Sequence, residues 1–314
     1  MKTTAQNRRD FLKKVGGTAL GLSALHAGAG AAYAKDELFK ISLAEWSLNP
    51  LIFSGKLDHL NFAREASRHG IFAVEYVNQF FMDKAEDKSY ISEMRNRAEG
   101  EGVTSVLIMC DNEGRLGDPD EALRIESVNN HKKWVRAAQM LGCHMIRVNG
   151  FSMGGFGEKG DFDEEMKLVA DGLQRLCVYA DDYDISVTIE NHGGNSSNGK
   201  WLSGVIEKAD HPRAGTLPDF GNFRIVEGES YDSYRGVKEL MPYAKGISVK
   251  PRVWDDHGNQ SDLDYERMMR IVLDAGYRGY CDIEYGPRGA EWEGVMEVKK
   301  MLEMTREKLA EDYT

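Results

Sequence analysis

The sequence predicts an α/β fold, a single (β/α)8 TIM barrel, on three observations. Short apolar runs alternate with amphipathic runs, and the alternation repeats eight times along the chain. Glycine ends several amphipathic runs, at Gly70, Gly102, Gly142 and Gly276, and supplies the left-handed cap that closes a helix before the next strand. Strand–helix alternation implies a parallel sheet, and eight units in ~250 residues match the size of this barrel.

The apolar runs are the expected strands. They lie at Lys40–Trp46, Ala73–Val77, Thr104–Cys110, Met145–Asn149, Ser186–Glu190, Gly215–Asp219, Gly246–Lys250 and Tyr280–Tyr285. An open doubly wound sheet is the alternative fold. That fold is expected to carry a glycine-rich dinucleotide turn after its first strand, whereas the turn here, Trp46–Pro50, contains no glycine.

The runs between the strands carry apolar residues at three- and four-residue spacing, which predicts helices. The expected helices are Leu57–His69, Lys88–Gly100, Asp120–Leu141, Glu164–Asp182, Trp201–Ala209, Tyr231–Met241, Asp262–Ala275 and Trp292–Leu309. The segment between Trp254 and Gln260 is polar, and we expect it to be either a plain connection or a mobile lid.

Residues 1–34 have the pattern of a twin-arginine signal peptide. Arg8-Arg9 is followed by a weakly apolar run from Val15 to Ala32 and by Ala32-Tyr33-Ala34, which has the small-x-small form of a cleavage site. We therefore expect residues 35–314 to be one exported barrel domain, periplasmic or otherwise outside the cytoplasm.

The charge of the expected mature chain limits its partners. Removal of the signal leaves 35 basic and 50 acidic residues, a net charge of −15. This charge argues against a nucleic acid or an anionic membrane as partner, and suits a neutral or cationic ligand or a metal ion. A homo-oligomer is left open. The four cysteines show no disulfide or CxxC spacing, and we expect them to be small buried side chains.

Polar residues follow the apolar strands at the point where each strand ends. In a barrel these carboxyl ends meet at one face, where active sites are built. Glu190, Asp219 and Glu284 end three late strands, and carboxylates crowded at one mouth repel each other unless a cation neutralises them. A divalent metal is therefore expected. Oxygen ligands favour Mg²⁺ or Mn²⁺, and an added histidine would favour Zn²⁺ or Co²⁺. The alternative is that each acid pairs with a Lys or Arg, or caps the following helix.

Four strand-end motifs resemble those of the xylose isomerase-like TIM barrels, also called sugar phosphate isomerases/epimerases. The motifs begin at Thr188 (TIENHGG), Leu217 (LPDFGNF), Ser248 (SVKP) and Asp282 (DIEY), and the resemblance extends over residues 38–312. It is strongest with an exported, twin-arginine branch. The resemblance implies one divalent ion held by Glu190, Asp219 and Glu284, with Glu190 and Glu284 also catalytic. The family's fourth ligand, a His, is replaced here by Ser248.

Further strand-end and loop residues are candidates for substrate binding. Each has a structural alternative, such as a core tryptophan, a hydrogen-bonded histidine or a solvated charge. His192 is favoured as a contact because two glycines follow it, and Lys250 and Arg252 could bind hydroxyls or stabilise an oxyanion. The full set is Trp46, Glu75, Asn149, His192, Asn222, Lys250, Arg252 and His257.

The resemblance predicts a sugar isomerase or epimerase that removes a proton beside a carbonyl through an enediolate. We expect a non-phosphorylated sugar or keto-sugar, because phosphorylated sugars are scarce outside the cytoplasm. A lyase that performs β-elimination on 3-keto-glycosides with the same site is one alternative. A non-catalytic sugar-binding barrel is another. An endonuclease IV-like enzyme needs a multinuclear, histidine-rich zinc site, and the seven scattered histidines and the acidic charge oppose it.

Overall fold

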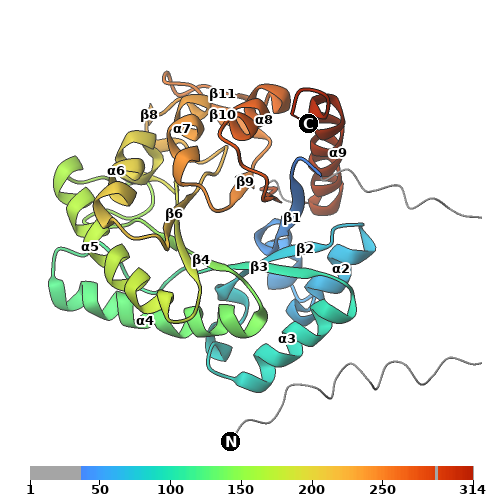
Figure 1. Cartoon of the computed structure of the whole chain (residues 1–314), viewed down its shortest axis with the longest axis horizontal. Helices are drawn as coiled ribbons and strands as arrows, with labels where there is room; N and C mark the ends of the chain where they lie inside the picture. The colour runs from blue at the N-terminus through green and yellow to red at the C-terminus, as the bar shows by residue number, and fades with distance from the viewer. Residues whose placement is uncertain (1–36, 287–288, 314) are drawn as a thin grey trace, which may run out of the picture. The chain divides into compact units, whose positions relative to one another are not determined.

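The computed structural model describes residues 37–286 and 289–313, so the expected signal peptide lies outside the described residues. Eight parallel strands form one sheet in the order β6-β5-β4-β3-β2-β1-β12-β9 (Figure 1). Two parallel bridges, Thr216 to Ala244 and Asp219 to Ser248, join the two end strands and nearly close the barrel. The predicted fold class is therefore confirmed, and the open doubly wound sheet is excluded.

The strands agree with the predicted runs to within two residues at either end. They are β1 (Lys40–Ala44), β2 (Ala73–Val77), β3 (Thr104–Met109), β4 (Met145–Asn149), β5 (Ser186–Glu190), β6 (Ala214–Leu217), β9 (Ile247–Val249) and β12 (Tyr280–Ile283). Several strands end earlier than predicted. Asp219 and Glu284, just beyond two of these strands, still pair with β9 through a bridge to Ser248 and a backbone bond to Val249 O.

Helices surround the sheet, and six of them begin at an Asp or Asn whose side chain accepts a backbone N–H of the first turn. The helices are α1 (Asn49–Phe53), α2 (Phe62–Arg68), α3 (Lys88–Gly100), α4 (Glu121–Leu141), α5 (Phe162–Asp181), α6 (Gly199–Ala209), α7 (Ser233–Leu240), α8 (Tyr265–Asp274) and α9 (Glu291–Leu309). Within the described residues, no helix is long and apolar enough to cross a membrane.

Two short hairpins were not predicted. One pairs β7 (Arg224–Val226) with β8 (Glu229–Ser230), and the other pairs β10 (Arg252–Trp254) with β11 (Gln260–Asp262). The polar segment after Trp254, expected as a connection or a lid, is the turn of the second hairpin. Asp255 closes this turn by accepting the backbone N–H of His257 and of Asn259.

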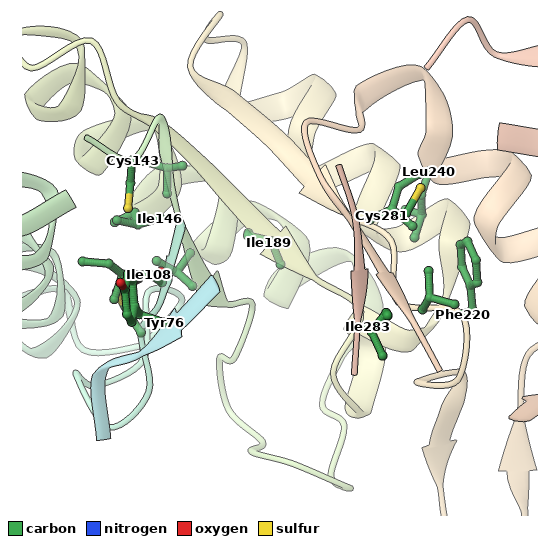
Figure 2. Packing of buried hydrophobic residues seen from close by; sticks show 14 of the residues in the cluster. Tyr76, Ile108, Cys143, Ile146, Ile189, Phe220, Leu240, Cys281 and Ile283 are labelled. Carbon is green, nitrogen blue, oxygen red and sulfur yellow. Dashed lines mark hydrogen bonds between the residues drawn. The ribbon is translucent and has the colours of Figure 1, made fainter. Parts of the chain in front are cut away.

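The core has two parts because side chains alternate along each strand. In β12, Cys281 and Ile283 pack outward against the helices, as do Ile146 and Ile189 in their strands (Figure 2). Asp282 lies on the opposite face of β12, inside the barrel. There an apolar cluster that includes Val77, Leu107 and Met145 fills the space between other strands. All four cysteines are buried and unpaired, as expected.

Candidate active site

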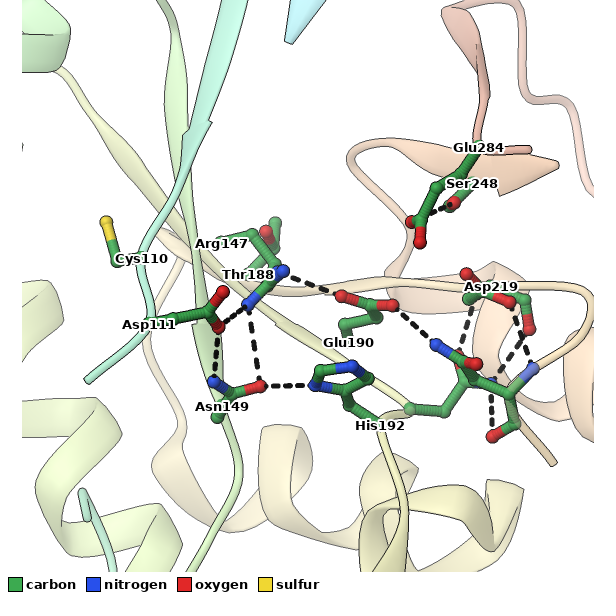
Figure 3. Close-up of polar contacts among 12 residues, drawn as sticks. Cys110, Asp111, Arg147, Asn149, Thr188, Glu190, His192, Asp219, Ser248 and Glu284 are labelled. Carbon is green, nitrogen blue, oxygen red and sulfur yellow. Dashed lines mark hydrogen bonds and ion pairs between the residues drawn. The ribbon is translucent and has the colours of Figure 1, made fainter. Parts of the chain in front are cut away.

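The three predicted metal-ligating carboxylates meet at the carboxyl end of the barrel. Glu190 ends β5, Asp219 follows β6 by two residues, and Glu284 directly follows β12. One oxygen of each lies within 4.8 Å of the others. Their exposures are 1%, 0% and 7%, so the cluster is nearly dry and its charges need partners (Figure 3).

Lys250 supplies one of these partners. Its Nζ lies 2.8 Å from Glu284 Oε1 and also contacts the Asp219 carboxylate. Burial alone would raise the pKa of Glu284, but Lys250 outweighs burial and lowers it. Burial dominates at Asp219 and raises its pKa to about 7. Ser248, at the position of the missing family His, donates its hydroxyl to Glu284 Oε2 at 3.2 Å.

Arg147 is the second partner and lies between two acids. Its Nε is 2.8 Å from Glu190 Oε2, and its Nη1 donates to Asp111 Oδ1 at 2.7 Å (Figure 3). Burial raises the pKa of Glu190 even though Arg147 opposes this effect. At Asp111 burial would raise the pKa, but Arg147 outweighs it and holds the pKa well below its usual range. Asp111 therefore stays ionised.

Burial keeps the His192 ring neutral, and Asn149 selects its tautomer. Asn149 donates its amide N–H to Asp111 Oδ1 at 2.8 Å, so its oxygen faces His192 Nδ1, also at 2.8 Å (Figure 3). The Asn149 oxygen can only accept, so Nδ1 carries the proton and Nε2 is left as an acceptor. Burial is the main reason that the pKa of His192 falls to about 4.

A cleft of about 480 Å³ opens beside these residues. Five of the predicted site residues line it: Trp46, Asn149, Glu190, His192 and Glu284. Asp219, Lys250 and Asn222 are not among the residues that line the cleft. Asn222 donates its amide to Glu190 Oε1 at 2.8 Å, so its contact is with a site carboxylate.

Three predicted substrate contacts lie elsewhere. Glu75 is fully buried inside the barrel, where it accepts the Ser42 hydroxyl at 2.9 Å. Arg252 is exposed on β10 beside Asp262, and His257 is exposed on the turn of the same hairpin. Strand-end position alone does not distinguish these residues from the cleft-lining ones, because it does not fix the direction in which a side chain points.

Several cleft residues were not predicted. They are Gln79, Asp111, Asn112, Arg115, Arg147, Phe151 and Phe156, most of them near the ends of β2, β3 and β4. Arg147 carried a usable signal, since a cation on an apolar strand needs a buried acid as its partner. The two glycines after His192 face the chain itself: a Cβ would lie 3.0 Å from Gly157 N at Gly193 and 2.2 Å from the backbone oxygen of Glu158 at Gly194. The β4–α5 loop fills that space.

The carboxylate cluster suits a hard divalent cation. Its ligand atoms are all oxygens, and Glu190 Oε2 receives no hydrogen bond even though Arg147 is near. Two cations already contact the three acids, however, and Lys250 occupies the space between two of them. The residues therefore fit an oxygen-ligated ion on condition that the ammonium moves away.

Comparison with known proteins was made by family model and by search. The family model described as xylose isomerase-like TIM barrel matches residues 63–307. L-ribulose-5-phosphate 3-epimerase UlaE of Escherichia coli is 22% identical over 229 residues, 67% of this chain and 74% of the epimerase. A putative hydroxypyruvate isomerase of Mus musculus is 24% identical over 91 residues. That match spans 29% of this chain and about a third, 32%, of the mouse protein.

Solved structures share the fold at low identity. The apo 3-keto-D-glucoside 4-epimerase YcjR from E. coli superposes with a TM-score of 0.65 at 14% identity, covering 85% of this chain and 99% of that one. A Mycobacterium smegmatis xylose isomerase-like barrel in complex with magnesium gives 0.65 at 15% identity, with 85% and 96% coverage. The IOLI protein with a zinc atom gives 0.67 at 12% identity, with 88% and 99% coverage.

Proposed function

Because this chain belongs to the xylose isomerase-like TIM barrel family, we propose that it is a sugar isomerase or epimerase that moves a proton beside a carbonyl. One observation carries the proposal. Two buried glutamates from separate strands, Glu190 and Glu284, line the same cleft and come within 4.8 Å of each other. Two carboxylates in one water-poor site can act as a proton acceptor and a proton donor on one substrate.

The chain's own residues supply the steps of this chemistry. One glutamate takes the proton from the carbon next to the carbonyl, and the other returns a proton. Return to the opposite face of the same carbon gives an epimer, and return to the neighbouring carbon gives an isomer. Arg147, on the cleft wall beside Glu190, provides positive charge near the oxygen that becomes negative. His192 offers its unprotonated Nε2 to a substrate hydroxyl.

The proposal includes one divalent ion, Mn²⁺, Mg²⁺, Co²⁺ or Zn²⁺, held by Glu190, Asp219 and Glu284. When bound, such an ion acts as a Lewis acid that acidifies the C–H bond beside the carbonyl. The three oxygen ligands favour Mg²⁺ or Mn²⁺ among these ions.

The substrate class follows from the expected location. We propose export through the twin-arginine pathway and a non-phosphorylated sugar or keto-sugar. Arg115, a cation on the cleft wall, is already paired with Asp118 at 2.9 Å. That pairing lowers its availability for a phosphate group, which supports a neutral substrate.

The test is solvent exchange. The purified mature chain is incubated in D₂O with D-fructose, other ketohexoses and 3-keto-glucosides, and deuterium uptake beside the carbonyl is followed by NMR. Glu190→Gln and Glu284→Gln are expected to lower the exchange rate by about 10²–10⁴-fold. Glu101→Gln, an exposed acid after α3, is the control.

Other outcomes support other functions. Release of the aglycone from 3-keto-glycosides, together with deuterium exchange beside the carbonyl, would favour the lyase. Binding of sugars without deuterium exchange, whichever divalent metal is added, would favour a non-catalytic sugar-binding barrel. If both glutamate variants keep full activity, the proposed roles of both residues are wrong.

A further inference from the structure

The cleft extends well beyond the two glutamates. Glu190 and Glu284 line it from the end of β5 and from just after β12, whereas β3 and the loop after it supply Met109, Asp111, Asn112, Gly114 and Arg115 to the wall. Gln79, after β2, also lines the cleft and donates to Asp111. The two glutamates therefore form only part of the wall.

A polar line of side-chain contacts connects Glu190 to Gln79. Glu190 Oε2 lies 2.8 Å from Arg147 Nε, Arg147 Nη1 donates to Asp111 Oδ1 at 2.7 Å, and Gln79 donates to Asp111 Oδ2 at 2.9 Å. These residues lie near the carboxyl ends of β5, β4, β3 and β2 in turn, and neighbouring strands lie about 4.8 Å apart, so the line covers about 14 Å along the curved sheet. One sugar ring at Glu190 would leave the part near Asp111 and Gln79 uncovered.

The cleft wall outside the two glutamates has the groups that a sugar ring needs. Asp111, held ionised by Arg147, can accept hydroxyl hydrogens. Asn112 places an amide at the wall and adopts φ 62, a conformation that asparagine tolerates better than most residues. Phe156 is 70% exposed, lines the cleft, and meets His192 edge-on with ring centroids 5.2 Å apart. An exposed phenyl ring beside polar groups suits a ligand with one apolar face and a rim of hydroxyls.

We propose that the part of the cleft formed by Gln79, Asp111, Asn112 and Phe156 is a second subsite, which binds a sugar ring glycosidically linked to the ring that reacts at Glu190 and Glu284. The substrate is then a disaccharide-sized keto-sugar. A cleft of about 480 Å³ falls within the range of sites that enclose ligands of that size. This inference rests on the proposed function for the identity of the reacting ring, but the subsite itself is measurable by binding alone.

The experiment compares D-fructose with lactulose and isomaltulose, two disaccharides in which fructose is the free keto-sugar. Dissociation constants are measured by calorimetry, and deuterium uptake gives kcat/KM for the same sugars. At least one disaccharide is expected to bind at least ten-fold more tightly than fructose. Equal or tighter binding of fructose, or no binding of either disaccharide at millimolar concentration, would overturn the inference.

Two variants locate the gain in affinity. Asn112→Gly removes the amide without strain at this positive φ, and Phe156→Ala removes the exposed ring. Each is expected to reduce the disaccharide-to-fructose affinity ratio at least three-fold. Phe72→Ala, which removes a phenyl that is 57% exposed just before β2 at the other end of the barrel, is the matched control and leaves the ratio unchanged. A ratio that both cleft variants leave intact would place the second ring elsewhere and refute the assignment.

The two proposals fail in different ways. Tighter binding of a disaccharide without deuterium exchange into any sugar would support the subsite and contradict the proposed isomerase or epimerase activity. Deuterium exchange into fructose, with no tighter binding of either disaccharide, would support the enzyme activity and contradict the subsite.

Discussion

Lys250 Nζ lies 2.8 Å from Glu284 Oε1 and also contacts the carboxylate of Asp219. The ammonium group thus occupies space between two of the three acids that would hold a metal. Its stem is fixed there by close packing on Gly221, where a Cβ would come within 2.8 Å of Lys250 Cβ. A monovalent and a divalent cation 4 Å apart repel by about 8 kcal/mol at an effective dielectric constant of 20. Lys250 and a metal ion therefore compete for these carboxylates.

Lys250→Met is expected to tighten Mn²⁺ binding at least ten-fold. Methionine keeps most of the stem and removes the charge, so the three acids repel each other until a cation binds. Calorimetric titration of the metal-free protein gives the affinity. Because the variant is less stable without metal, the rise in Tm on saturation with Mn²⁺ provides a second readout, and it should exceed the rise in the unmodified protein.

Lys245→Met is the matched control, because Lys245 precedes β9 and donates to Pro212 O, away from the carboxylates. It should leave Mn²⁺ affinity unchanged. Weaker or unchanged binding in Lys250→Met would mean that the lysine assists the metal site or is indifferent to it.

Ser248→His is expected to change which metal the site prefers. Ser248 is fully buried and its Oγ lies 3.2 Å from Glu284 Oε2, so an imidazole at this position would lie beside the carboxylates. A nitrogen ligand favours Zn²⁺ and Co²⁺ over Mg²⁺. We expect the ratio of Zn²⁺ to Mg²⁺ affinity to rise at least ten-fold relative to Ser248→Ala.

Imidazole is larger than a hydroxymethyl group, so overpacking in this buried position is expected to cost about 1–3 kcal/mol of stability. Combining Ser248→His with Lys250→Met removes the ammonium that contacts Glu284 and Asp219 and would compete with the ion. An unchanged Zn²⁺ to Mg²⁺ ratio in the folded double variant would mean that residue 248 does not reach the ion.

The eight strands and most helices could be predicted from the sequence because hydrophobic periodicity and Asp or Asn caps act locally. α3 begins and ends as predicted, at Lys88 and Gly100. The hairpin of β10 and β11 was missed because its strands are three residues long and β11 is entirely exposed, so they carry no apolar pattern.

The meeting of Glu190, Asp219 and Glu284 could also be predicted, since barrel topology brings strand ends together. The partners of these acids could not. Nothing local in the sequence places Lys250 Nζ on Glu284 or Arg147 between Glu190 and Asp111, because those contacts depend on side-chain direction across neighbouring strands. Glu75 shows the same limit, since it lies on a strand with its side chain inside the barrel and away from the cleft.

Glu75 is expected to make the protein less stable as pH rises. Burial is the main cause that raises its pKa to about 8, against an ordinary value near 4.5. Between these values the folded state keeps a proton that the unfolded state has released, so the contribution of Glu75 to stability is greatest below about pH 4.5 and declines as pH rises toward 8. The effect is at most a few kcal/mol.

Glu75→Gln keeps the size and the hydrogen bond from Ser42 and removes the titration. Urea unfolding between pH 5 and 9 is expected to show a smaller loss of stability in this variant and a higher stability than the unmodified protein at pH 8. Glu101→Gln, at an exposed position, should keep the original slope. A Glu75→Gln variant that is less stable at pH 8 would mean that the native carboxyl is ionised and stabilised there.

Arg147→Met is expected to be strongly destabilising. Arg147 is 4% exposed, and its guanidinium lies between Glu190 and Asp111. Its loss therefore leaves two buried carboxylates without their cationic partner. Breaking a buried pair in this way costs about 3–5 kcal/mol. Adding Asp111→Asn removes one stranded charge and keeps an acceptor oxygen for one of the two amides, Gln79 or Asn149, that donate to Asp111.

Urea unfolding at pH 7 of the two single variants and the double variant forms a double-mutant cycle. The double variant should be more stable than Arg147→Met alone, with a coupling energy of about 1–3 kcal/mol. Strictly additive losses would indicate that Arg147 contributes through packing rather than through its charge. In that case a group other than Arg147 would have to keep Asp111 ionised on the cleft wall. The contacts of Arg147 with Glu190 and with Asp111 would then be energetically independent of each other.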